Sequence, residues 1–462
     1  MTGRRESARA EGILARLDAL TVWPYPRRVL IVVGAAYFFA FFDIVTIGIA
    51  LPVISEQFHV SAGRASLAVT LSLVGYVAGS LLDSLLSDYI GRGPALVASV
   101  LMFSVGCAVT AVAPGLPLLF AGRFITGMGI GAEIEAASAF VGELSPARLR
   151  GRAGSVTVAW GYVGLAVVPV LGLVLVPDLS WGWRLLFVIG GLGGLVVLPF
   201  RLRLPVSPRW LTAHGRDDEA DTAVTAAEDF AALRLERRPA AAGVAPGAAP
   251  AGSGAGAGPG ARPQAAAPLL EPAQPEEFWR SAALFVAVWF VYYIGNYGWL
   301  TLAPTLLTEH GFGLTNSLAF LSVTGVGFVA GSLIAVAVGE RVERKWTIAA
   351  ALVAWAVVLT GIGLWPVAAV IMSLGFLASL TIGLAVPLMY VFTGEQFHST
   401  VRARGIALGD GVGHIGGALA PVLILPAAAV AFGWGFAVMA LSGLIAAGLV
   451  LLGRRMTGRA VE

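Results

Sequence analysis

The chain has 462 residues, of which 57% are hydrophobic and only 12% are charged, and its formal net charge is +3. Soluble globular proteins carry about 25% charged residues, and half that proportion cannot cover a water-exposed surface of this size. The single cysteine, Cys107, excludes an intramolecular disulfide framework and a cysteine-rich metal site. We therefore expect an integral membrane protein rather than a soluble enzyme, with no metal and no catalytic residues.

The chain begins with a polar segment, residues 1–28. Within residues 10–20 four apolar side chains share one helical face, which predicts a short helix; they are Ile13, Leu14, Leu17 and Leu20. Such a helix either lies on the inner membrane surface or leads into the first span as a solvated helix.

Twelve apolar runs follow, separated by short charged or Gly/Pro-containing breaks. A membrane helix needs about 20 apolar residues, and each run must be helical because hydrocarbon offers no partner to backbone groups. The fold class is therefore an all-α integral membrane protein with 12 transmembrane helices. The predicted spans are residues 29–54, 65–87, 94–113, 116–141, 152–176, 182–202, 280–307, 316–339, 346–365, 367–393, 405–428 and 432–453.

The connection at residues 204–279 divides the spans into two groups of six, residues 29–203 and 280–453, and residues 454–462 form a tail. Its part 239–268 is Ala, Gly and Pro with almost no large side chains, so we expect this loop to be largely a disordered linker. Basic residues concentrate at both ends of the chain and in the even-numbered connections. The positive-inside rule therefore predicts that both termini, the loop and the tail are cytoplasmic.

Spaced charges recur in the two groups of spans at one offset of 252 residues, from 88 to 340 and from 143 to 395. Two matches at one offset indicate a duplicated unit, and hence two pseudo-symmetric six-helix bundles. These charges can form ion pairs at the cytoplasmic face. Because an exposed ion pair stabilises a structure by only about 0–1 kcal/mol, several pairs together would hold a gate closed and still let it open. The alternative is that they only orient the protein. The predicted gate comprises Asp88, Arg92, Glu143, Arg150, Glu340, Arg344, Glu395 and Arg402.

Three motifs resemble those of the major facilitator superfamily. They are Asp88-x-x-Gly91-Arg92, Arg123-x-x-x-Gly127-x-Gly129-x-Gly131 and Pro205-Val-Ser-Pro-Arg209-Trp210. The first departs from the family pattern at Ser84 and Gly93, and the third at Val206. The runs GMGIGAEIEAASAFVGELSPARLRG, YYIGNYGWLTLAPTLLTEHGF and GDGVGHIGGALAP are similar to a bacterial branch of niacin, aromatic-acid and other metabolite:proton symporters related to sugar porters. The resemblance implies a two-bundle, multi-pass secondary transporter of the bacterial cytoplasmic membrane.

Ionisable side chains inside the spans are functional candidates, because burying them in a bilayer costs several kcal/mol unless they are paired or hydrated. Asp43 lies in the middle of the first span without a polar neighbour in sequence. The resemblance implies that Asp43 pairs with Arg123 and carries the coupling proton. A fixed structural ion pair is the alternative.

Further ionisable residues lie in spans 4 and 11. Glu133 and Glu135 are about 200° apart on a helix, so at most one faces the central cavity. We assign Glu133 to proton coupling or substrate orientation. Asp410 and His414 are spaced i, i+4 and can touch, and a structural hydrogen bond is the favoured interpretation.

The resemblance implies that spans 1, 4, 7 and 10 line the central cavity. Span 7 contributes Tyr293, Asn296 and Tyr297, whose amphipathic rings and amide suit a small ring or a polyol. Tyr390 and Trp160 join them as candidate substrate-binding residues. An aromatic belt at the membrane interface is the alternative for span 7.

We therefore expect a secondary active transporter that moves a small metabolite by alternating access together with a proton. The expected substrate is an organic or aromatic carboxylate such as nicotinate. The alternatives are a sugar:proton symporter, an efflux antiporter and a non-transporting membrane receptor on the same fold. The expected partners are the substrate, protons and the lipid bilayer, with no nucleic acid and no cofactor, and we expect the chain to act as a monomer.

Overall fold

The computed structural model describes residues 2–236, 275–339, 341–397 and 401–455. Within these ranges twelve helical segments are long and apolar enough to cross a membrane, which confirms the predicted number of spans. The spans of the first half are α2 (Arg28–Gln57), α3 (Ala62–Ala65) with α4 (Leu67–Ile90), α5 (Arg92–Ala111), α6 (Leu116–Leu144), η1 (Ala147–Leu149) with α7 (Arg150–Leu175), and α8 (Gly182–Arg201).

The spans of the second half include two that combine several segments. These are α11 (Pro275–Tyr297), η2 (Gly298–Leu302) and α12 (Ala303–Glu309), and later α16 (Arg402–Ala407), η3 (Leu408–Val412) and α17 (Gly413–Val430). The others are α13 (Leu314–Val338), α14 (Arg344–Leu364), α15 (Ala368–Glu395) and α18 (Phe432–Val450). Both η2 and η3 are π-helical turns, which widen a helix locally and occur often at functional sites.

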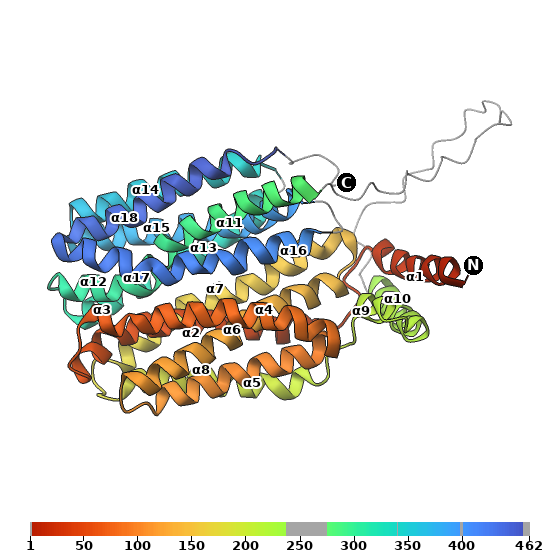
Figure 1. Cartoon of the computed structure of the whole chain (residues 1–462), viewed down its shortest axis with the longest axis horizontal. Coiled ribbons are helices and arrows are strands. Elements are labelled where there is room, and N and C mark those ends of the chain that lie inside the picture. The colour runs from red at the N-terminus through yellow and green to blue at the C-terminus, as the bar shows by residue number, and fades with distance from the viewer. Residues whose placement is uncertain (1, 237–274, 340, 398–400, 456–462) are drawn as a thin grey trace.

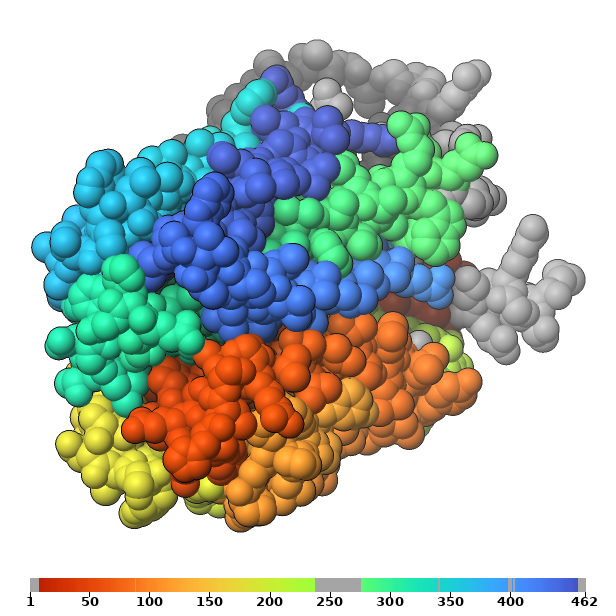
Figure 2. Space-filling view, turned by 60° about the vertical axis from the view of Figure 1, so that its left-hand side comes forward, coloured from red at the N-terminus to blue at the C-terminus, as the bar shows by residue number. Residues whose placement is uncertain are grey.

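The two groups of six form two bundles that lie against each other (Figure 1). The main contacts between them join α4 to α17 and α7 to α13, and α2 also contacts η2 and α12. Figure 2 shows the blue α17 region seated on the red and orange helices of the first half. The first helix, α1, lies at one end of the molecule in Figure 1, which we call the terminal end.

The same backbone contacts occur in both halves at the sequence offset of the charge pattern. A Cβ added to Gly75 or Gly79 of α4 would collide with the backbone of α6 at Phe124 or Met128. In the second half a Cβ added to Gly327 or Gly331 of α13 would collide with α15 at Phe376 or Leu380, each 252 residues further along. Small residues let membrane helices approach to backbone contact. The duplication predicted from the charges is therefore built into the helix packing.

Three further helices form a small unit at the terminal end: α1 (Thr2–Ala19), α9 (Pro208–Ala213) and α10 (Asp217–Glu236). Ile13 and Leu17 of α1 are 5% and 0% exposed, in a cluster with Leu211, Ala220 and Val224. Ile13 and Leu17 of the apolar face of α1 therefore pack on α9 and α10. The loop expected to be largely disordered begins with the two helices α9 and α10, whereas its residues 237–274 lie outside the described residues.

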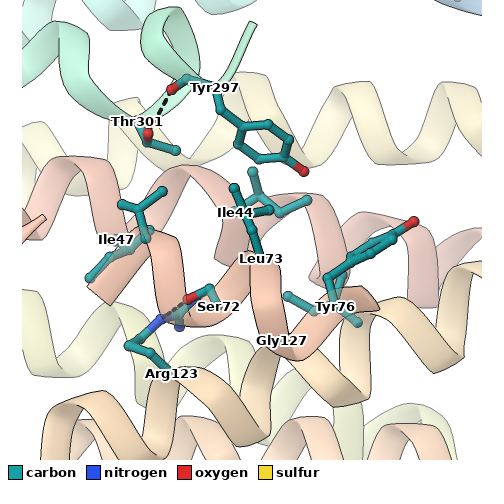
Figure 3. A pocket seen from close by; sticks show the side chains of 11 residues that line it. Ile44, Ile47, Ser72, Leu73, Tyr76, Arg123, Gly127, Tyr297 and Thr301 are labelled. Atoms are coloured by element: carbon teal, nitrogen blue, oxygen red, sulfur yellow. Dashed lines mark hydrogen bonds between the residues drawn. The ribbon is translucent and has the colours of Figure 1, made fainter. Parts of the chain in front are cut away.

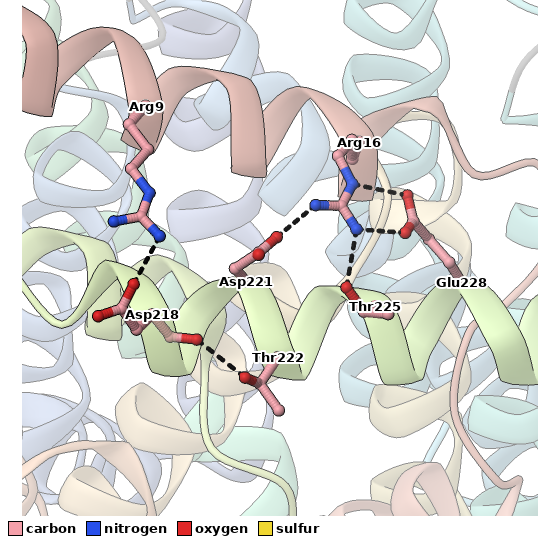
Figure 4. A network of polar contacts seen from close by, with 7 residues as sticks. All are labelled: Arg9, Arg16, Asp218, Asp221, Thr222, Thr225 and Glu228. Carbon is pink, nitrogen blue, oxygen red and sulfur yellow. Dashed lines mark hydrogen bonds and ion pairs between the residues drawn. The ribbon is translucent and has the colours of Figure 1, made fainter.

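Ion pairs join α1 to α10 on the side shown in Figure 4. Arg9 contacts Asp218 at 2.5 Å, and Arg16 bonds to both oxygens of Glu228 at 3.0 and 2.5 Å and also contacts Asp221. The hydrogen bonds to Glu228 and Asp221 raise the pKa of the Arg16 guanidinium. Arg209 of α9 then bonds to Asp18 and to the Glu143 carbonyl oxygen, which attaches the unit to the first half.

Candidate transport site

A buried ion pair lies inside the first half. The Arg123 guanidinium on α6 contacts both carboxylate oxygens of Asp43 on α2, at 2.6 and 3.0 Å, and both residues are 1% exposed. Arg123 also donates through Nε to Ser72 Oγ at 2.9 Å, and its guanidinium lies 5.2 Å from the Phe187 ring centroid. The structure thus forms the pair that the resemblance implies, and Cys107 Sγ lies 3.6 Å from Asp43.

Arg123 also lines a pocket between the two halves (Figure 3). The pocket is narrow in this conformation, with free space for little more than one water molecule. Tyr297 and Thr301 reach it from the second half, where α11 passes into η2. The remaining lining residues come from α2, α4 and α6: Ile44, Ile47, Val69, Ser72, Leu73, Tyr76, Arg123, Gly127 and Ile130. Arg123, but not Asp43, therefore borders the space shared by both halves.

Glu133 lies in a different place. Both of its carboxylate oxygens accept hydrogen bonds from the guanidinium of Arg201 at the end of α8, and the bond from Arg201 Nη1 to Glu133 Oε2 measures 2.6 Å. Glu133 Oε2 also accepts a hydrogen bond from Ser99 Oγ at 2.6 Å. Glu133 lines a second, very small pocket formed by α2, α5, α6 and α8, all within the first half. The structure therefore does not bring Glu133 to the pocket that Arg123 lines. Glu135, on the other side of α6, is within electrostatic range of Asp410 in the second half.

A cluster of tyrosines surrounds Asp410 in the π-helical turn η3. Tyr293 of α11 and Tyr390 of α15 each donate to Asp410 Oδ1 at 2.5 Å, and Tyr76 of α4 donates to Oδ2 at 3.1 Å. Asp410 is 1% exposed and His414 is 3% exposed. Tyr76 also lines the central pocket, so the cluster lies directly beside it.

The predicted substrate-binding residues are therefore spread over several environments. Tyr297 lines the pocket, whereas Tyr293 and Tyr390 bond to Asp410. Asn296 is buried and accepts a hydrogen bond from Tyr292 at 2.9 Å. Trp160 is 39% exposed and packs beside Gly34 at the contact of α2 with α7, so the structure does not bring it to the pocket.

Two pairs of predicted gate residues form within the described part of the chain, one in each half. Arg92 bonds to Glu143 at 2.9 Å, and the counterpart Arg344 bonds to Glu395 at 2.6 Å. Each pair joins the start of one helix to the end of the next. Arg150 lies 3.7 Å from Asp18. Glu340 and the side chains of Asp88 and Arg402 lie outside the described residues.

Sequence reasoning missed two residues that complete these sites, Arg201 and Tyr76. Arg201 falls inside the predicted span 182–202, and a cation at that depth signals a buried partner. Tyr76 is a single tyrosine in an apolar span, and the sequence carries no signal that it faces the second half.

The comparisons with known proteins agree with this architecture. Residues 33–335 match the major facilitator superfamily, and the chain belongs to this family of membrane transporters. It is 27% identical to the niacin transporter NiaP of Acinetobacter baylyi over 453 residues, which are 97% of this chain and 99% of that protein. It is 24% identical to a benzoate transport protein of the same species, covering 88% of this chain and 84% of that one.

The fold is similar to that of the xylose transporter XylE from E. coli in a partially occluded inward open conformation. The TM-score is 0.70 at 16% identity, with 94% of this chain and 98% of that chain covered. This likeness concerns the fold. The chain is therefore a multi-pass membrane transporter for small molecules, and its relatives are transporters rather than enzymes.

Proposed function

We propose that this transporter moves a small organic carboxylate together with a proton, and that a single-ring acid such as nicotinate or benzoate is its substrate. The observation that carries the proposal is the position of Arg123, which binds Asp43 on one side and lines the central pocket on the other. The similarity to transporters of niacin and benzoate supports the substrate class.

The geometry supplies a coupling mechanism. A guanidinium offers five N–H donors in a fixed fork, which matches a carboxylate. While Asp43 is ionised, it occupies both Nη atoms of Arg123. Protonation of Asp43 removes its charge and leaves the Arg123 cation in a buried site without a counter-ion, which is costly. A substrate carboxylate in the pocket then replaces the missing anion, so proton binding and anion binding favour each other.

Tyr297 supplies the contact from the second half. Its ring lines the pocket opposite Arg123 (Figure 3), and its hydroxyl makes no hydrogen bond to any residue in the described ranges. A ring acid held by Arg123 would therefore meet an aromatic face and a free hydroxyl across the interface. The pocket is narrow in this conformation, so a ring acid would enter it only when the two halves move apart.

We place the terminal end in the cytoplasm of a bacterium, because the basic connections gather there. We propose that the pairs Arg92–Glu143 and Arg344–Glu395 brace the helix ends of each half at that face, and that the chain works as a monomer. Glu133 then serves the first bundle through Arg201 rather than the transported proton.

The test is uptake into proteoliposomes of labelled nicotinate, benzoate and a hexose, with and without an inward proton gradient. We expect the gradient to drive accumulation of one of the acids. Asp43→Asn is expected to abolish accumulation while counterflow exchange of the same acid persists. Asp178→Asn is the matched control, because it makes the same change at an exposed position away from the pocket.

Acid uptake that ignores the gradient in the wild type would refute proton coupling. Gradient-driven uptake of the hexose alone would refute the carboxylate substrate and favour a sugar:proton symporter. Accumulation that survives Asp43→Asn would assign the coupling proton to another group.

A further inference from the structure

The cluster around Asp410 is built from both halves of the transporter. Asp410, Tyr293 and Tyr390 belong to the second half, on η3, α11 and α15, whereas Tyr76 belongs to α4 of the first half. The same α4 packs along α17, where Thr70 Oγ1 donates to the Ala418 carbonyl oxygen at 2.8 Å. A rocking motion that separates α4 from α17 would therefore remove Tyr76 and let water reach the Asp410 carboxylate.

Asp410 has one potential cation beside it. No Arg or Lys contacts its carboxylate among the described residues, and the nearest basic group is His414, whose Nδ1 lies 3.9 Å from Asp410 Oδ2. The same Nδ1 is 2.7 Å from the Asp410 carbonyl oxygen. Because a carbonyl oxygen only accepts, Nδ1 carries a hydrogen, and Nε2 is the nitrogen whose protonation decides the charge.

The imidazole of His414 is enclosed by aromatic rings. It stacks on Tyr76 at a centroid distance of 3.7 Å, lies 4.1 Å from Tyr293 and 5.6 Å from Tyr297. Among the described residues, the other ionisable groups within electrostatic range of Asp410 add no positive charge; they are Glu135 of α6, Tyr37 of α2 and Tyr297 of α11. With one proton shared between Asp410 and His414 the pair is neutral, and without that proton a net negative charge is buried.

We infer that Asp410 and His414 together form a second proton-binding site, which Tyr76 covers when the two halves close at this level. The site holds one proton while it is dry and releases it when the halves separate and water enters. A dry site disfavours the unpaired charge, and water restores its solvation. The inference rests on the proposed alternating access but not on the identity of the substrate or on the role of Asp43.

The Asp410–His414 site and the Asp43 site differ in what controls their proton binding. Asp43 has a permanent counter-ion in Arg123 within the same half, so its proton responds to the contents of the pocket. The Asp410–His414 pair has no permanent counter-ion among the described residues. One of the side chains that shield it from water, Tyr76, belongs to the opposite half. Its proton therefore responds to closure of the halves. This second proton would link conformation to pH even without substrate.

The experiment measures closure directly, without substrate. Spin labels are attached to cysteines at Arg203 and Arg341, which are exposed and follow the ends of α8 and α13 in the two halves. The native Cys107 is buried and does not need to be removed. All variants carry Asp43→Asn, so the proposed first coupling site does not titrate. Distances are recorded by pulsed electron resonance in nanodiscs from about pH 5.5 to about pH 8.5.

We expect the closed fraction to fall as pH rises, because an equilibrium linked to one proton changes by up to about tenfold per pH unit in its titration range. Adding Asp410→Asn is expected to remove this dependence, and so is His414→Asn, which keeps a donor for the Asp410 carbonyl. Having two variants guards against misfolding of one. Glu135→Gln is the matched control and is expected to leave the dependence in place.

Three results would overturn the inference. One is a closed fraction that does not change with pH in the Asp43→Asn background. The second is a pH dependence that survives both Asp410→Asn and His414→Asn. The third is a dependence abolished by Glu135→Gln alone, which would assign the proton to Glu135. Loss of gradient-driven uptake in Asp43→Asn would be observed separately, so the two proposals fail independently.

Discussion

Replacing Glu133 by Gln separates a structural role from a role in proton transfer. The Glu133 and Arg201 side chains are 5% and 1% exposed and share two contacts, and Ser99 adds a third bond to the carboxylate. Gln keeps the shape of the side chain but leaves the Arg201 charge uncompensated. Removing one partner of a buried ion pair costs about 3–5 kcal/mol, so we expect Glu133→Gln to lower the free energy of unfolding by that amount.

The opposite change gives the same pair a second test. Arg201→Met is expected to destabilise the protein to a similar extent, because it leaves the Glu133 carboxylate buried without a cation. The double variant Glu133→Leu/Arg201→Met, compared with Glu133→Leu and Arg201→Met alone, removes both charges, and an apolar pair of similar volume is often close to neutral. We therefore expect the double variant to regain most of the loss, so that its destabilisation is well below the sum of the two single values.

The assay is reversible unfolding in mixed detergent micelles, followed by tryptophan fluorescence, together with gradient-driven uptake by each folded variant. Glu219→Gln is the control, because Glu219 pairs with Arg216 on the exposed face of α10 and surface pairs contribute only about 0–1 kcal/mol. A Glu133→Gln protein as stable as the wild type, but without gradient-driven uptake, would refute the structural role and return Glu133 to proton coupling.

Three shorter predictions concern other contacts. Gly48→Val places a side chain against the Thr301 backbone, whose oxygen lies 2.6 Å from the position of the added Cβ. We expect the α2–η2 contact to open and uptake to fall more than about tenfold (about 1.4 kcal/mol). Gly63→Val is the control, because Gly63 has open space around it, and it should keep normal uptake. Arg344→Met should lower the free energy of unfolding by about 1.5–3 kcal/mol, because it removes the charge-assisted hydrogen bond to Glu395. The variant Arg344→Glu/Glu395→Arg exchanges the two charges, and a stability no higher than that of Arg344→Met would contradict this prediction. Ile13→Asp should release α1 from α10, seen as faster amide exchange in α1, whereas Gly12→Asp, with nothing within 4 Å, should not.

The membrane topology could be read from the sequence because each span must satisfy its own backbone. The predicted span 116–141 corresponds to α6, Leu116–Leu144, and 432–453 corresponds to α18, Phe432–Val450. The duplication was also visible, since the charges that now form the pairs Arg92–Glu143 and Arg344–Glu395 kept their spacing. These features depend on local composition and spacing, which a single sequence contains.

The choice of partners for the buried charges was harder to predict. Hydrophobicity is nearly uniform around a helix that is buried in a bilayer, so it does not reveal which face of α6 meets α8 and which meets the second half. Glu133 and Glu135 could be separated only as lying on different faces, and the structure directs Glu133 to Arg201. The environment of Asp410 depends on three tyrosines from α4, α11 and α15, whose rotation no short-range pattern specifies.

The helices α9 and α10 were missed for another reason. The segment is polar, and it continues into a run of Ala, Gly and Pro, so its composition resembles a linker. Its order comes from α1, more than 200 residues earlier in the chain, through Ile13 and the ion pairs of Arg16. A helix whose stability depends on such a distant partner has a weak signal in its own sequence.

The repeated glycine contacts of α4 with α6 and of α13 with α15 have a consequence for how this polypeptide could be divided. Each six-helix half has its own backbone-to-backbone seam and its own Arg–Glu brace, and α1, α9 and α10 all attach to the first half. Covalent continuity between residues 237 and 274 therefore adds little to either fold. Two separately synthesised fragments, ending and beginning within that stretch, should assemble in the membrane into a working carrier, as a non-covalent dimer of unlike halves.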